Sequence, residues 1–170
     1  AEASYQKAIE LKPDYAEAHY NQGNTLKDAG KFQQAQKSYQ EALRIKPEFA
    51  PAYNNLGNVL ENCNRLSDAA TSYQKAIDID PSFAEAHSNL GNALLGIGKL
   101  EEAAASYQKA LAIKPEYAEA HYNLGNALGD VGKWQDAILS YQKAIAIKPD
   151  LPSAHGNLGH ALWFSGEPAK

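Results

Sequence analysis

The sequence has few of the residues that carry reactive chemistry or cross-links. Its 170 residues include one cysteine, Cys63, no methionine and two tryptophans. One cysteine cannot form a disulfide within the chain, which suits a reducing compartment, and we expect the cytoplasm. No apolar run is long enough to span a membrane, and 16 basic against 20 acidic side chains leave a net charge of −4 without a basic patch. Neither a membrane nor a nucleic acid is therefore an expected partner.

The dominant feature of the sequence is a repeat of 34 residues. Three residue types mark the same period: the prolines Pro13, Pro47, Pro81, Pro115 and Pro149, the tyrosines Tyr5, Tyr39, Tyr73, Tyr107 and Tyr141, and the glycines Gly23, Gly57, Gly91, Gly125 and Gly159. A period of this length, with helical patterning inside each unit, predicts an all-α solenoid of helix pairs without strands.

We number the repeat from Ala84 as position 1. Positions 4, 7, 8, 11, 20, 24, 27 and 32 are then His87, Leu90, Gly91, Leu94, Ala103, Tyr107, Ala110 and Pro115. This pattern resembles the tetratricopeptide repeat family over the whole chain, except that position 4 holds His or Tyr where the family favours Trp or another aromatic residue. The resemblance implies a right-handed α-solenoid of antiparallel helix pairs.

We interpret residues 1–170 as one array. Residues 1–15 supply a second helix (helix B), four full repeats follow at 16–49, 50–83, 84–117 and 118–151, and residues 152–170 supply a first helix (helix A). Helix A is predicted at positions 1–14 and helix B at positions 17–30. Because the chain begins in mid-repeat without methionine, we interpret it as a fragment of a longer protein.

Two kinds of signal predict where helix A begins and ends. Asp14 with Glu17, and Ser82 with Glu85, have the spacing of side-chain caps at its start. Gly30, Gly98, Gly132 and Gly166, with Asn64 in the second repeat, suit a left-handed residue that ends it.

Neither a metal site nor a catalytic site is predicted. The position-4 histidines (His19, His87, His121 and His155) lie on successive rungs about 10 Å apart and cannot share one zinc ion. No acidic residue has a partner suited to acid–base catalysis, and Cys63 has no His or Lys beside it in sequence. We therefore expect no cofactor and no enzyme activity.

Asparagine recurs at two positions of helix A. Position 6 is Asn21, Asn55, Asn89, Asn123 and Asn157, and position 9 is Asn24, Asn58, Asn92 and Asn126. We call these nine residues the asparagine ladder. Asparagine is a mediocre helix residue, so its recurrence needs a reason. Two interpretations stay open: the amides bond between neighbouring helices, or they bind the backbone of an extended peptide, since a carboxamide both donates and accepts.

The family resemblance implies that the ladder faces a concave groove. The array resembles the tetratricopeptide superhelix of O-linked N-acetylglucosamine transferases, in which an equivalent ladder grips substrate polypeptides. Tyr20 and Tyr122 at position 5 would add aromatic contacts, and Glu17, Glu85 and Glu119 at position 2 would make one edge mildly acidic. Tyr20, Glu85 and Asn89 replace the basic anchors of the carboxylate clamp found in chaperone-binding members, so we reject chaperone-tail binding.

Three functions compete. The leading hypothesis is a non-catalytic scaffold that binds an extended polypeptide through asparagine side chains. The second is a substrate-recruiting arm of a larger enzyme, such as a protein O-glycosyltransferase. The third is self-association end to end, because the helix B at the start and the helix A at the end are complementary halves of one repeat.

Overall fold

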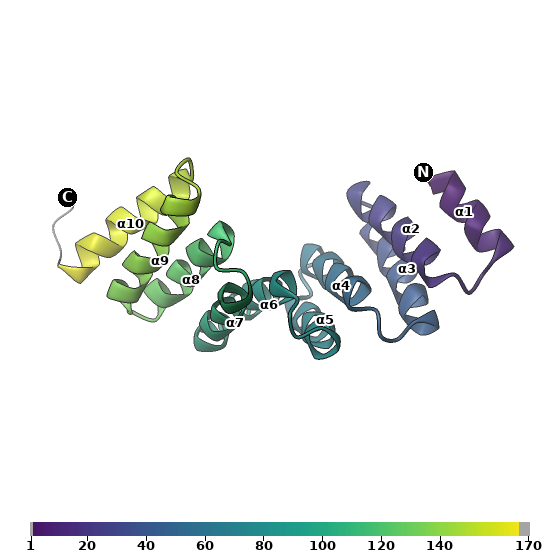
Figure 1. The fold of residues 1–170 in the computed structure, drawn as a ribbon, viewed down its shortest axis with the longest axis horizontal. Coiled ribbons are helices and arrows are strands. Elements are labelled where there is room, and N and C mark those ends of the chain that lie inside the picture. The colour runs from purple at the N-terminus through teal and green to yellow at the C-terminus, as the bar shows by residue number, and fades with distance from the viewer. Residues whose placement is uncertain (1, 167–170) are drawn as a thin grey trace. The chain divides into compact units, whose positions relative to one another are not determined.

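The structure is a computed structural model in which residues 2–166 are described, with side chains from Ser4 onward. Within that range the chain forms ten helices and no strand, which confirms the predicted all-α class. The helices are α1 (Glu2–Leu11), α2 (Ala16–Asp28), α3 (Phe32–Ile45), α4 (Ala50–Asn62), α5 (Leu66–Ile79), α6 (Ala84–Gly96), α7 (Leu100–Ile113), α8 (Ala118–Asp130), α9 (Trp134–Ile147) and α10 (Pro152–Ser165) (Figure 1).

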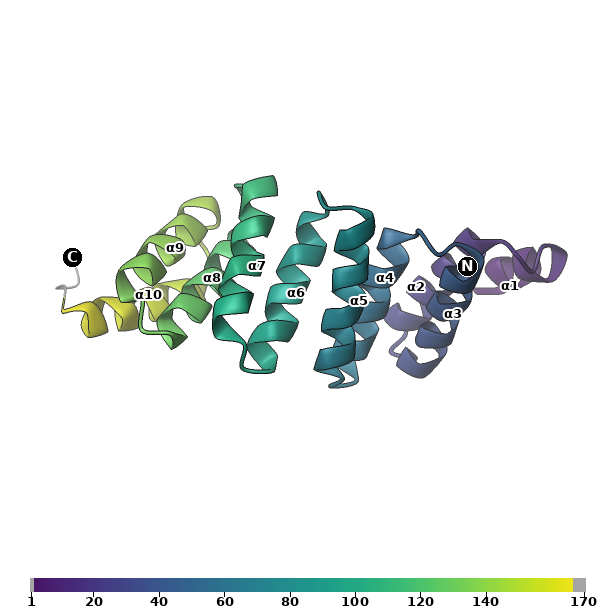
Figure 2. The same ribbon diagram turned by 90° about the horizontal axis from the view of Figure 1, so that it is seen from below.

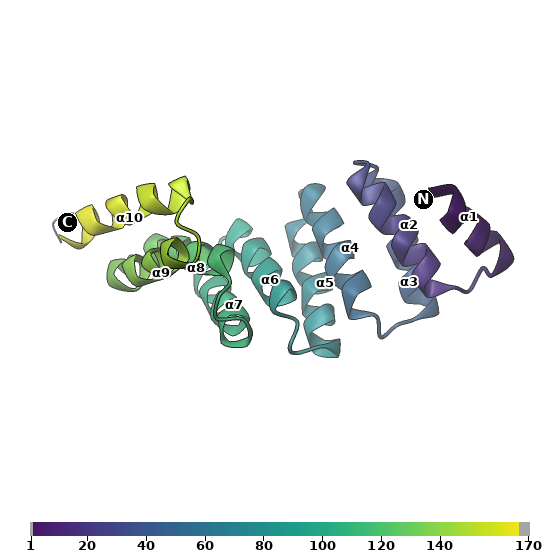
Figure 3. The ribbon, with the colours of Figure 1, turned by 45° about the horizontal axis from the view of Figure 1, so that its top comes forward.

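The chain divides into two compact units, Ala1–Ser82 and Phe83–Lys170. In the first unit α2 contacts its partner α3 and the next helix A, α4 (Figure 3). In the second unit α6 contacts α7 and α8, and α8 contacts α9 and α10 (Figure 2). Among the described residues of each unit, every helix contacts the next one or two helices along the chain, which is how a solenoid forms its core.

The core of each repeat rests on a contact between a glycine and a tyrosine ring. A Cβ atom added to Gly57 would lie 2.4 Å from Cε1 of Tyr73, closer than real Cβ atoms approach. Tyr73 is fully buried between the two helices, as are Ala69 and Ala76 on the same helix B. Positions 8, 20 and 27 therefore hold glycine or alanine because the ring at position 24 and the adjacent helices leave no space for a larger side chain.

Helix A ends as predicted in four repeats and in α10. Gly30, Gly98, Gly132 and Gly166 have φ between 73° and 81°, and Asn64 has φ 57°. After α2, the Lys31 amide donates to the Leu26 carbonyl at 2.8 Å and the Gly30 amide donates to the Lys27 carbonyl at 2.9 Å. This double hydrogen bond satisfies carbonyls that the helix leaves unpaired.

The predicted side-chain caps at the start of helix A were wrong. The capping residues are Tyr15 and Phe83, one residue later than expected, and neither makes a side-chain capping bond. Ser82 instead donates its hydroxyl to Asp80 at 2.7 Å. Glu17 turns toward Lys46, whose Nζ lies 3.0 Å from Oε1 of the glutamate. An ion pair 29 residues away along the chain thus replaces the local hydrogen bond.

Candidate functional site

Hydrogen bonds in the first unit join the asparagine ladder to the buried tyrosines. Oδ1 of Asn24 accepts from the Tyr39 hydroxyl at 2.8 Å and from Nδ2 of Asn55 at 2.8 Å. Asn55 belongs to the next repeat, so one carbonyl oxygen links helices α2, α3 and α4. In the following repeat the Tyr73 hydroxyl lies 2.7 Å from Oδ1 of Asn58.

The second unit repeats this arrangement. Oδ1 of Asn92 accepts from Tyr107 at 2.7 Å and from Nδ2 of Asn123 at 3.0 Å. Oδ1 of Asn126 accepts from Tyr141 at 2.9 Å and from Nδ2 of Asn157 at 2.8 Å. The interpretation that the amides bond between neighbouring helices therefore accounts for one amide atom in five residues: Asn24, Asn92, Asn126, Asn123 and Asn157.

Five of the ladder amides have one half without a partner among the described residues. Among the described residues, none accepts a hydrogen bond from Nδ2 of Asn24, Asn92 or Asn126. None donates to Oδ1 of Asn123 or Asn157. At these five asparagines, position 9 therefore presents N–H donors and position 6 presents carbonyl acceptors, and their orientation is fixed by the bonds to tyrosine and to each other.

The two tyrosines predicted at position 5 are tied to the same network. The Tyr20 hydroxyl accepts from Nδ2 of Asn55 at 3.1 Å, and the Tyr122 hydroxyl accepts from Nδ2 of Asn157 at 3.3 Å. The Tyr20 ring centroid lies 4.9 Å from that of Phe49. Both tyrosines remain partly exposed beside the ladder, so each can offer a ring face while it orients the next asparagine.

The three glutamates predicted to make an acidic edge each lie beside a lysine. Glu17 pairs with Lys46 at 3.0 Å and Glu85 with Lys114 at 3.2 Å, and Glu119 lies 3.8 Å from Lys148. The hydrogen bond from Lys46 holds the pKa of Glu17 below its usual value. Because each carboxylate has a neighbouring cation, the edge carries alternating charges.

A cavity of about 370 Å³ opens beside the ladder in the second unit. Its amide wall is Asn126 and Asn157, and Trp134 supplies an aromatic wall. Position 12 of this repeat is Gly129, which also lines the cavity. A Cβ atom added there would lie 3.3 Å from the Trp134 ring, so a larger residue would take up part of the cavity.

The position-4 histidines hold the preceding turn. Nε2 of His19 donates to the Pro13 carbonyl at 2.9 Å, and His121 and His155 make the same bond, also 2.9 Å, to Pro115 and Pro149. Within residues 2–166 no three His, Cys, Asp or Glu side chains are placed to hold a metal ion. None of the described helices has both the length and the apolar character to cross a membrane.

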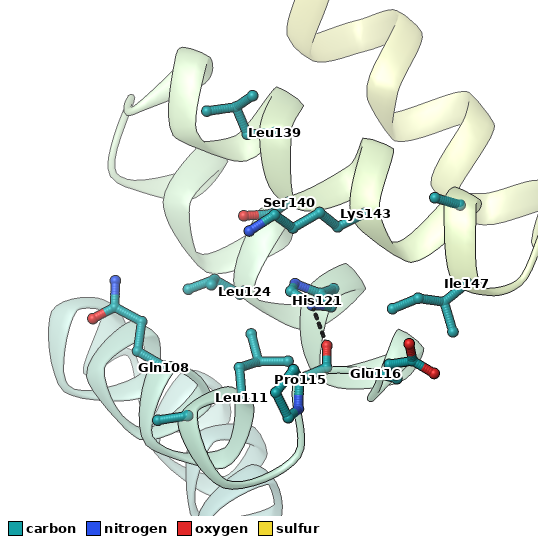
Figure 4. A pocket seen from close by; sticks show the side chains of 12 residues that line it. Gln108, Leu111, Pro115, Glu116, His121, Leu124, Leu139, Ser140, Lys143 and Ile147 are labelled. Carbon is teal, nitrogen blue, oxygen red and sulfur yellow. Dashed lines mark hydrogen bonds between the residues drawn. The ribbon is translucent and has the colours of Figure 1, made fainter.

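The sequence interpretation missed a second opening, on the helix B side of the second unit, which no ladder asparagine lines. It is a groove of about 630 Å³ between α7 and α9, with α8 at its base (Figure 4). Leu111, Leu124 and Leu139 contribute to its lining. The sequence did contain one signal for this groove: apolar residues replace polar ones at exposed helix B positions of the later repeats.

Sequence comparison identifies the repeat independently. The family described as "TPR repeat" matches residues 23–62, 62–98, 92–132 and 130–166, and a second, "Tetratricopeptide repeat", matches residues 4–37. No curated protein matches the chain.

Solved structures show the same fold. The crystal structure of MamA is 30% identical, with a TM-score of 0.81 over 85% of this chain and 84% of that one. YrrB, "a TPR protein with an unusual peptide-binding site", is 29% identical with a TM-score of 0.79 over 91% of this chain and 80% of its own. MamA 41-end from Desulfovibrio magneticus RS-1 is 23% identical with a TM-score of 0.83, over 89% of this chain and 86% of its own, a likeness of fold alone.

Proposed function

Because the chain belongs to the tetratricopeptide repeat family, we propose that it is a non-catalytic scaffold that holds an extended segment of a partner protein along the asparagine ladder. Members of the family are interaction modules, and the similar protein YrrB is described by its peptide-binding site. The proposal for this chain rests on its own asparagines.

The division of each amide group carries the proposal. Nδ2 of Asn92 and Oδ1 of Asn123 point away from the bonds that fix the two side chains, as a donor and an acceptor on adjacent repeats. An extended peptide exposes one N–H and one C=O per residue, which are the complementary groups. Such contacts hold a backbone without selecting its side chains, so the site would accept many sequences.

The geometry of the partner follows from the repeat. Adjacent helices are about 10 Å apart and an extended chain advances about 3.3 Å per residue, so one rung meets every third residue. The side chain of one residue in each three can then enter the space between rungs. In the second unit that space is the cavity beside Gly129 and Trp134.

The decisive variant carries Asn92→Asp and Asn126→Asp. Aspartate keeps the oxygen that accepts from Tyr107 or Tyr141, and it replaces the outward N–H donors with an acceptor. A fluorescein-labelled random-coil peptide of serine, threonine and alanine serves as the probe, and its binding is measured by fluorescence anisotropy. We expect at least about tenfold weaker binding, since each lost donor leaves a peptide carbonyl unpaired.

The matched control is the double variant Asn92→Leu and Asn126→Leu. It removes the acceptor of two buried tyrosine hydroxyls and should lower the free energy of unfolding by about 1–3 kcal/mol per site. Thermal unfolding separates the two effects. Unchanged peptide binding by the folded aspartate variant would contradict the proposal.

A second candidate, self-association, is favoured by one observation on α10. Gly159 has no atom within 4 Å of an added Cβ, whereas every other position-8 glycine faces a tyrosine ring. Trp163 on the same helix is 74% exposed. We propose that in the isolated 170-residue chain α1 of a second copy, which carries Tyr5, covers this face. Sedimentation velocity should show concentration-dependent association that Leu162→Lys with Trp163→Glu abolishes; an unchanged profile would reject it.

A further inference from the structure

The groove between α7 and α9 is lined by residues that surface helices rarely place together. Leu139 and Ile147 on α9 are 57% and 38% exposed, and both lie at its edge (Figure 4). Leu111 from α7 and Leu124 from α8 line it from below. No ladder asparagine lines the groove, although α8, which forms its base, carries Asn123 and Asn126.

The other repeats of the chain provide an internal comparison. Three of the apolar lining positions differ in character elsewhere in the chain: Ala112, Leu139 and Ala146. Two repeats earlier the same positions are charged or polar: Arg44, Thr71 and Asp78. The two sets of residues occupy the same repeat positions and the same helix faces. Packing of the repeat alone therefore does not require apolar residues at these positions. The apolar side chains are explained if another molecule covers them.

In the equivalent place of the first unit a larger side chain occupies position 4. There position 4 is Tyr53, and Lys75 lies over its ring with Nζ 5.4 Å from the centroid. In the groove the smaller His121 occupies position 4 and is bound to the Pro115 carbonyl. The corresponding lysine, Lys143, has no aromatic ring beneath it and forms no ion pair with any described residue. The groove therefore combines an apolar floor with two charged side chains, Lys143 on α9 and Glu116 in the loop before α8.

We propose that this groove binds the apolar face of an amphipathic helix from a partner protein, with an acidic side chain of that helix against Lys143. A helix suits the site because it satisfies its own backbone groups and presents aliphatic side chains one turn apart. A strand would need unpaired backbone groups beside it, and the walls here are the sides of helices, whose amides and carbonyls bond internally. Lys143 favours an acidic side chain next to α9, whereas Glu116 disfavours one next to the loop before α8.

The test uses the 170-residue chain and a defined peptide probe. The peptide is a fluorescein-labelled helix of about 18 residues, five turns, with leucines on one face, glutamates along one edge and glutamines elsewhere. A second peptide replaces the glutamates with lysines. Fluorescence anisotropy gives the affinity of each peptide, and circular dichroism confirms that each protein variant is folded.

The groove variant carries Ala112→Arg, Leu139→Thr and Ala146→Asp, the residues that the chain itself holds two repeats earlier. We expect it to weaken binding of the glutamate peptide at least about tenfold, since it removes the apolar anchor site. His121→Tyr should weaken binding similarly by filling the groove. Equal affinity of wild type and groove variant, or no saturable binding to the wild type, would overturn the proposal.

Lys143→Glu tests the charge, with Lys109→Glu as the matched control. Both lysines occupy position 26 of their repeats, and Lys109 does not line the groove. Lys143→Glu should weaken the glutamate peptide by about two- to fivefold and strengthen the lysine peptide, whereas Lys109→Glu should do neither. Equal effects of the two variants would reject the role of Lys143. Sedimentation that shows a wild-type dimer lost in the groove variant would assign the groove to a second copy and overturn the partner helix.

Discussion

A Cβ atom on Gly91 would lie 2.6 Å from Cε1 of Tyr107, and the hydroxyl of that ring lies 2.7 Å from Oδ1 of Asn92. Asn92, the residue after Gly91, thus accepts a hydrogen bond from Tyr107, whose ring fits only because Gly91 has no side chain. Both contacts depend on how closely helix α7 approaches α6, so packing and ladder orientation share one geometric cause.

Gly91→Ala should therefore destabilise the chain. The ring of Tyr107 is fully buried and cannot move aside, so the added methyl group should lower the free energy of unfolding by about 1–3 kcal/mol. Gly159→Ala is the control: nothing lies within 4 Å of its Cβ, and alanine is the better helix residue by about 0.5–1 kcal/mol. Urea unfolding measures both. A larger loss at Gly159 than at Gly91 would contradict the packing account.

Alkaline pH should destabilise the fold through the tyrosines at position 24. Burial raises the pKa of Tyr141 to about 12 and raises the pKa of Tyr39 and Tyr73 further. A raised folded-state pKa means that the contribution to stability is complete below pH ~10, the unfolded value, and is lost as pH rises toward the folded value. Absorbance at the tyrosinate band should therefore increase in a second step that coincides with loss of helix by circular dichroism. Ionisation of all tyrosines near the ordinary pKa without unfolding would be inconsistent with their burial.

Mild acid should act through His121. Burial lowers the pKa of His121 below its usual value, and the hydrogen bond to Pro115 opposes that shift only in part. The sign is opposite to that of the tyrosines: stability is complete above pH ~6.5 and is lost as pH falls toward the folded pKa. NMR titration of the imidazole should give a pKa below 6.5, and the stability of His121→Tyr should depend less on pH in that range. A measured pKa above the usual value would reject the assignment.

The helices could be predicted from the sequence because the same 34-residue pattern recurs in every repeat. Helix B was expected at residues 32–45 and is found at Phe32–Ile45; helix A was expected at 16–29 and ends at Asp28. The caps failed because their cause is not local. Glu17 has the spacing of a capping box, but Lys46 lies within reach in space and takes its carboxylate.

The division of the asparagine amides could not be predicted from the period. It requires that Tyr39, 15 residues after Asn24, and Asn55, 31 residues after it, reach the same oxygen. Sequence reasoning therefore left a choice between a structural and a ligand-binding role. The geometry shows structural bonds at one atom of several amides, and the ligand-binding role of the other atom stays a proposal. The groove beside Leu139 was missed because its lining joins residues of three helices, none of which has a motif.

The bonds between asparagines also affect how the chain unfolds. Asn123 bonds to Asn92 and Asn157 to Asn126, in each case from one repeat to the preceding one, so their energy belongs to the junctions and not to any single helix pair. In a linear array, the sharpness of unfolding depends on junction energy relative to the intrinsic stability of each repeat. Loss of one such bond would broaden the unfolding transition as well as lower its midpoint. It would also let the terminal helices unfold separately from the rest of their unit.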